Sequence, residues 1–181
     1  MRFAVSAATL CLTLLTGCTS APPLNFSVPN VSPSNQKLDA DLKAVSVSFA
    51  APSEQTGEVP SNGEGIPQLW ERAVVEAVNK SSVFDDESAR KVNIFVKIQE
   101  LDPPAGGFTM VTDTTAKYLL VNRKTGETIM EETISTKGIV PPGYAFAGIT
   151  RAKESINRAV QNNIHDFLLQ LEAKTSSSLG K

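Results

Sequence analysis

The sequence VNIFVKIQE at residues 92–100 decides the fold class, because apolar and polar side chains alternate along it. This two-residue period is that of a strand with one buried face. The apolar face carries Val92, Ile94, Val96 and Ile98. Such a strand is stable only beside other strands and under a covering layer, which the segments on either side must supply.

Three further strands are predicted, at residues 44–49, 108–121 and 127–137. The last two flank the polar turn NRKTG, in which Gly126 can take the left-handed conformation that a tight turn needs. We therefore expect an antiparallel hairpin there. The strand before the turn is long, and we expect a bulge or a bend near Asp113.

Two amphipathic helices are predicted to cover the sheet, at residues 67–81 and 151–174. Pro67 suits a first helical turn, and Thr150 suits an N-cap. Trp70 lies on an apolar stripe, so we expect it to anchor the core and not to stack on a ligand. The element order predicts an α+β two-layer sandwich, with a mainly antiparallel four-stranded sheet and both helices on one face. The opening strand, helix and strand favour a parallel crossover.

The N-terminus carries the strongest functional signal. Met1 and Arg2 precede an apolar run over residues 3–15, which fits the core of an export signal but is shorter than the roughly 20 residues of a membrane span. The run ends in Leu15-Thr16-Gly17-Cys18, which resembles the lipobox of bacterial lipoproteins. The alternative is an ordinary signal peptide whose cleavage region contains a cysteine.

The lipobox resemblance implies that residues 1–17 are a signal peptide, cleaved after Gly17. It also implies that the Cys18 thiol takes a diacylglyceryl group and that the new amine is acylated. The residue after the cysteine is Thr19 and not Asp, which by the same resemblance favours the outer membrane, facing the periplasm. Cys11 leaves with the signal peptide, so the mature chain has no disulfide and depends on an apolar core.

The predicted mature chain has three parts: a lipidated, Pro-rich tether at residues 18–43, a domain at residues 44–174 and a polar tail at residues 175–181. As a flexible coil, a 25-residue tether would reach about 25–30 Å. Phe26, Val28 and Val31 are unusual in a spacer. They either pack on the domain or a partner, or are scattered apolar residues of a tether.

The composition excludes several classes of function. Lys and Arg number 17 against 19 Asp and Glu, so the chain lacks the basic excess of nucleic-acid binders. His165 is the single histidine and no nucleophile elbow accompanies it, which argues against a hydrolase triad. The acidic run Asp85–Glu87 lacks the spacing of a calcium loop and is predicted to be a solvated turn. We expect no enzyme, no metal and no cofactor.

The best candidate for an interaction surface is the connection GIVPPGYAFAGI at residues 138–149. Its apolar side chains are costly in water unless something covers them. Tyr144 and Phe146 could insert into a partner or among lipid headgroups, or could fold back over the open end of the sheet. An exposed sheet edge that accepts a strand from another chain is a second candidate.

A wider resemblance rests on layout. The lipobox, the Pro-rich segment, the first strand, the hairpin YLLVNRKTGETI and the closing helix RAKESINRAVQNNIHDFLLQL together resemble small periplasm-facing lipoproteins of the YajG type. The layout is also similar to that of LptE and of the curli-secretion lipoprotein domain. The resemblance implies a non-enzymatic accessory or assembly role, in which the protein binds another envelope component. The alternative is a binding module for a small apolar or glycan ligand.

Overall fold

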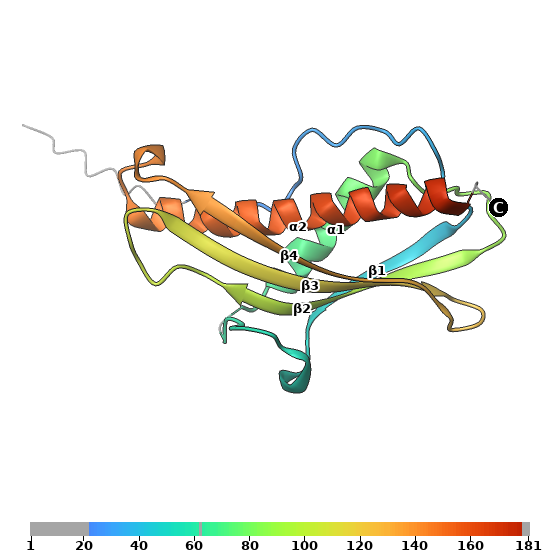
Figure 1. Cartoon of the computed structure of the whole chain (residues 1–181), viewed down its shortest axis with the longest axis horizontal. Coiled ribbons are helices and arrows are strands. Elements are labelled where there is room, and N and C mark those ends of the chain that lie inside the picture. Colours follow the sequence, from blue (N-terminus) through green and yellow to red (C-terminus); the bar gives the residue numbers. More distant parts are fainter. Residues whose placement is uncertain (1–21, 62, 179–181) are drawn as a thin grey trace, which may run out of the picture.

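In residues 22–61 and 63–178, which the computed structural model describes, four strands and two long helices follow in the order that the sequence predicts. Figure 1 shows β1 (Asp41–Phe49), α1 (Ile66–Ser81), β2 (Lys91–Asp102), β3 (Met110–Asn122), β4 (Thr128–Val140) and α2 (Gly148–Ser178). Two single-turn 3-10 helices, η1 (Pro52–Glu54) and η2 (Pro142–Tyr144), lie in the connections.

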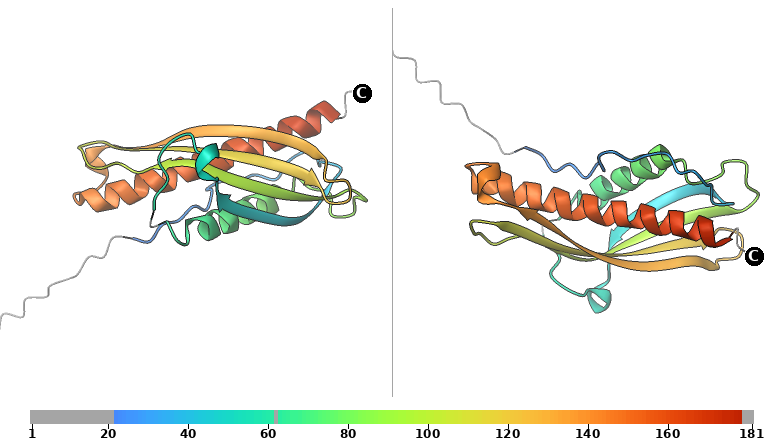
Figure 2. Two further views of the ribbon diagram at one scale, coloured as in Figure 1. Left: turned by 90° about the horizontal axis from the view of Figure 1, so that it is seen from below. Right: turned by 45° about the horizontal axis from the view of Figure 1, so that its top comes forward.

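The sheet has the strand order β1-β2-β3-β4, and both helices pack on the same side of it (Figures 1 and 2). β1 runs parallel to β2, while the β2–β3 and β3–β4 pairs are antiparallel. The predicted α+β sandwich, its parallel crossover and its hairpin are therefore confirmed. The loop between β1 and α1 lies on the opposite side of the sheet (Figure 1).

The bulge expected near Asp113 is wrong, because Asp113 pairs in regular register with Asp102 on one side and with Lys137 on the other. The register shifts fall elsewhere, with one extra residue at Lys43 in β1, one at Gln99 in β2 and one at Ile129 in β4. Extra residues of this kind increase the local twist of a strand.

A buried chain of hydrogen bonds joins both helices to the sheet. The indole Nε1 of Trp70 in α1 donates to the Tyr118 hydroxyl at 3.2 Å, and that hydroxyl donates to Asn163 Oδ1 in α2 at 2.8 Å. The Asn163 Nδ2 then donates to the carbonyl of Ile134 in β4 at 2.7 Å. Trp70, Tyr118 and Asn163 are all inaccessible to solvent, so the expected core anchor at Trp70 is confirmed. The Tyr118 ring also stacks on Phe167.

Replacing Tyr118 with Phe is expected to destabilise the fold by about 2 kcal/mol at pH 8, because the Trp70 N–H and the Asn163 oxygen would stay buried without their partner. Burial raises the pKa of Tyr118 far above its ordinary value, while the hydrogen bond from Trp70 opposes the shift. The Tyr118 hydroxyl ionises near pH 10 in the unfolded chain but stays protonated in the folded chain. Above that pH the folded state therefore binds more protons than the unfolded state, and the stability of the wild type falls as the pH rises. The Tyr118→Phe variant lacks this loss.

Urea denaturation of both proteins at pH 8 and pH 11 measures the effect. The stability gap between wild type and Tyr118→Phe should narrow by about 1.4 kcal/mol over this range. A gap that stays constant would mean that the Tyr118 hydroxyl is open to solvent in the folded protein.

The segment predicted as a tether packs on the domain instead. Phe26 and Val28 belong to the hydrophobic core, and the Phe26 ring meets that of Trp70 edge-on with the centroids 6.2 Å apart. The backbone of Asn25 accepts from Gln161 and donates to Asn157, both on α2. Leu38 and Ala40 are buried as well. The alternative that these apolar residues pack on the domain is thus the one found, and residues 24–43 do not act as a spacer.

α2 is longer than predicted at both ends. It begins at Gly148, so Thr150 lies inside the first turn and is not the N-cap. At the other end the helix continues through the residues predicted as a polar tail, as far as Ser178, and Thr175 is buried. The Thr175 hydroxyl donates to the carbonyl of Glu172, which lets a polar residue occupy the buried side of a helix.

α2 lies against the edge strand β4 at close range. The side chains of Arg158 and Asn162 donate to the carbonyls of Ile139 and Lys137, as Asn163 does to Ile134. Gly138 permits this approach, since a Cβ atom there would overlap the carbonyl oxygen of Ser155 and contact the amide of Ala159. The strand and the helix therefore meet backbone to backbone.

Candidate interaction surface

Exposed apolar side chains gather at one end of the molecule, where β2 turns into β3 and β4 leads into α2. β3 starts at Met110, paired with Val140 at the end of β4, so both connections project from the same end of the sheet. We call this end the apolar tip and define it by Phe108, Ile139, Tyr144, Phe146 and Ile149. Phe146 is 105% exposed and Phe108 is 86% exposed, which is costly in water for apolar side chains.

The connection that carries the tip is held in place by α2. The guanidinium of Arg151 donates to the carbonyls of Ala145 at 2.6 Å and of Phe146 at 2.9 Å. Arg158 lies over the ring of Tyr144, with its guanidinium carbon 5.1 Å from the ring centroid. Charge-assisted hydrogen bonds and a cation–π contact therefore fix the loop while Phe146 projects outward.

The structure places both predicted interaction residues, Tyr144 and Phe146, at this tip, with Tyr144 about half exposed. Neither folds back to cover the end of the sheet. Ile139 and Ile149 also belong to the connection predicted as the interaction surface, although Tyr144 and Phe146 alone were singled out in it. Sequence reasoning missed Phe108, because it falls in a segment predicted as a strand. The alternation of β4 continues to Val140 and puts the exposed Ile139 on the opposite face from the buried Val140 side chain. Cys18, the predicted lipidation site, lies outside the described residues.

The charged residues considered for chemistry do not form a reactive site. The Nδ1 of His165 lies 3.7 Å from Asp166 Oδ1, closer than their adjacent places on a helix predict, but both side chains are about half exposed. The amide of Glu87 donates to Asp85 Oδ1, as in a solvated turn. In the described part of the chain, the carboxylate, histidine and cysteine side chains form no group that could hold a metal ion.

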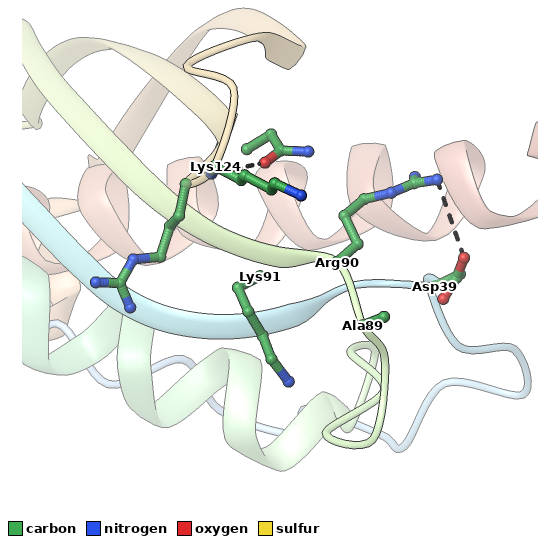
Figure 3. A pocket seen from close by; sticks show the side chains of 7 residues that line it. Asp39, Ala89, Arg90, Lys91 and Lys124 are labelled. Carbon is green, nitrogen blue, oxygen red and sulfur yellow. Dashed lines mark hydrogen bonds and ion pairs between the residues drawn. The ribbon is translucent and has the colours of Figure 1, made fainter.

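A basic depression of about 700 Å³ lies at the end opposite the tip, where β2 begins and the β3–β4 turn closes. Figure 3 shows its cationic side chains pointing in different directions, with Arg90 toward Asp39 and Lys124 extended across the turn. Lys91 binds Asp41 at 2.6 Å, and together with Lys43 it lowers the pKa of that carboxyl. These pairings leave no convergent set of donors for a single anion.

The space between the helices and the sheet is filled by core side chains. Trp70, Tyr118 and Phe167 are each 1% exposed or less and occupy its centre. A second depression, of about 480 Å³, is lined by Phe49 and by residues 60–61, 63–65 and 67–68 on the outer surface. Among the described residues, then, the layers enclose no chamber of the kind that a small apolar ligand would need.

The sheet edges, the second predicted candidate, are β1 and β4. α2 engages three carbonyls of β4, and Glu71 of α1 accepts from the amide of Val47 in β1 at 3.3 Å. Both edges are thus partly occupied by the helices of the same chain.

None of the helices in residues 22–61 and 63–178 is both apolar enough and long enough to span a bilayer.

Comparison with known proteins shows similarity in structure and none in sequence. No protein-family model matches the chain, and no characterised protein matches it by sequence. Protein XCC0632 from Xanthomonas campestris, of family DUF330, superposes with a TM-score of 0.56 at 12% identity over 88% of this chain and 98% of its own. A putative lipoprotein from Caulobacter crescentus superposes with a TM-score of 0.47 at 10% identity, over 77% of this chain and 92% of its own. PelC from Paraburkholderia phytofirmans superposes with a TM-score of 0.46 at 14% identity, over 78% of this chain and 93% of its own. The chain therefore shares the fold of XCC0632, and this likeness concerns the fold alone.

Proposed function

We propose that this protein is a lipid-anchored, periplasm-facing lipoprotein of the outer membrane, which binds another envelope component through its apolar tip and has no catalytic activity. The observation that carries the proposal is the collection of five exposed apolar side chains at one end of the fold, where Arg151 of α2 binds the connection that carries Tyr144 and Phe146. The lipobox at residues 15–18 supplies the anchor, and the layout resembles that of YajG-type and LptE-like lipoproteins.

The domain supports an accessory role over a ligand-binding one. Its centre is occupied by a buried hydrogen-bond chain from Trp70 to Asn163, whereas the apolar side chains of the tip are exposed. A preformed apolar surface of this kind favours docking, because little conformational entropy is lost when it is covered.

Substituting Cys18 with Ser is expected to abolish lipid attachment completely, since oxygen in place of sulfur removes the nucleophile that takes the diacylglyceryl group. Cells that express the full chain and are fed labelled palmitate provide the measurement. The matched control is Cys11→Ser, which changes the other cysteine of the chain and should leave the label intact. Label that persists in Cys18→Ser, or that is missing from the wild type, contradicts the anchor.

The component that meets the tip can be found with a photo-crosslinking amino acid at Phe146 in living cells. A crosslinked adduct at this position, and none from the same probe at Leu169 near the other end of α2, supports docking through the tip. Equal adducts from both positions would show that the tip has no special role.

A further inference from the structure

The start of the described chain and the apolar tip lie at the same end of the molecule. In both views of Figure 2 the first described residues, in dark blue, lie near the end where η2 and α2 begin. Asn25 is fixed there by hydrogen bonds to Asn157 and Gln161, in the first half of α2. The position of Cys18 is therefore limited by the few residues that connect it to Asn25.

The length of that connection decides which surface can touch the bilayer. Asn25 lies seven positions after Cys18 in the sequence, and seven fully extended steps span at most about 25 Å. Along α2, the distance from Asn157 to Gly148 at the tip is about 14 Å at 1.5 Å per residue. The distance from Asn157 to Ser178 at the other end is about 32 Å by the same rise. A lipid on Cys18 can thus reach the membrane beside the tip and cannot reach it beside the opposite end.

The chemistry of the tip matches a bilayer interface. Aromatic and aliphatic side chains project from two adjacent connections, and the cation of Arg158 lies over the ring of Tyr144. Aromatic residues with one apolar and one polar end favour the headgroup region, and apolar side chains gain free energy by entering the acyl boundary.

We infer that the envelope component at the tip is the lipid bilayer itself: Phe108, Phe146 and Ile149 insert among the headgroups of the leaflet that holds the Cys18 lipid. The domain then stands on its tip with α2 directed away from the membrane. The inference rests on the proposed lipid anchor and adds a second, protein-based contact to it.

The test uses full-length lipidated protein, purified from cells and reconstituted into phosphatidylethanolamine and phosphatidylglycerol vesicles with or without acyl-brominated lipid. Bromine quenches tryptophan only at close range. The chain has one native tryptophan, Trp70, which is buried and gives a constant background. Phe146→Trp reports on the tip, and Leu169→Trp is the matched control, because Leu169 is an exposed apolar residue of the same molecule more than 20 positions further along the chain.

The emission that Phe146→Trp adds should fall by about half in brominated vesicles and shift to shorter wavelength, as expected for a side chain at the acyl boundary. The emission that Leu169→Trp adds should not change. Vesicle-bound protein in which Phe146→Trp is quenched no more than Leu169→Trp overturns the bilayer contact and leaves the anchor standing. Protein that carries no lipid overturns both. If the probe at Phe146 crosslinks to a protein in cells and not to lipid, the tip docks on that protein and the inference is wrong.

Discussion

Replacing Gly138 with Ala should destabilise the protein by about 3 kcal/mol or more, an unusually large cost for adding one methyl group. The added Cβ would overlap the carbonyl oxygen of Ser155 and contact the amide of Ala159. Both are backbone atoms of α2, so no side chain can rotate away to relieve the overlap. The helix must shift as a body from β4.

Such a shift would also break contacts around the same point. Thr112 is paired with Gly138 in the sheet and shares a buried 2.8 Å hydrogen bond with Ser155. The hydroxyl of Thr136 donates to the carbonyl of Ala159 at 2.8 Å. Losing these bonds inside the fold leaves polar groups without partners, which adds to the cost of the overlap.

Chemical denaturation of wild type and Gly138→Ala measures the loss. Gly143→Ala is the matched control, since position 143 has open space for a methyl group and a backbone conformation that alanine accepts. It should change stability by less than about 0.5 kcal/mol. Equal stability of the two variants would show that β4 and α2 lie further apart than described.

Truncating Phe26 to Ala should cost about 3–4 kcal/mol, as for other buried aromatic residues. The ring is 2% exposed and packs edge-on against Trp70, while the neighbouring Ser27 hydroxyl donates to Glu76 of α1 at 2.7 Å. Loss of the ring leaves a cavity beside the largest side chain of the core. It also removes the main apolar contact that holds residues 24–28 across α1 and α2.

Thermal unfolding and limited proteolysis test this prediction together. Phe26→Ala should unfold at a lower temperature and should be cut within residues 24–40 under conditions in which the wild type resists. Val31→Ala serves as the control, because Val31 is only partly buried against the same core and its truncation should cost under about 1.5 kcal/mol. If Phe26→Ala behaves like Val31→Ala, the segment is a free tether after all.

The main elements could be predicted from sequence because their periods are strong. The alternation over residues 92–100 and the turn around Gly126 identify the hairpin, and the stripe through Trp70 identifies α1. The parallel pairing of β1 with β2 follows from the helix between them. Each of these features depends on residues close together in the sequence, so the spacing of apolar and turn residues is enough to predict it.

The misplaced features depend on contacts between distant segments. Phe26 lies in a Pro- and Ser-rich stretch without periodicity, so nothing nearby indicates that Trp70 and α2 cover it. Gly138 resembles a loop residue until α2 is seen against its backbone. The tip could be predicted only in part for the same reason: its aromatic residues are conspicuous in the connection, whereas Phe108 joins them from another hairpin end through the pairing of Met110 with Val140.

The asparagine and arginine side chains that α2 extends to β4 have a consequence under the proposed lipid anchor. Molecules restricted to a plane collide far more often than molecules in bulk solution, and an unpaired strand edge is a template for pairing with other copies. The carbonyls of Ile134, Lys137 and Ile139 already have donors from their own helix. On a crowded leaflet, these bonds would hinder the addition of further strands along this border of the sheet.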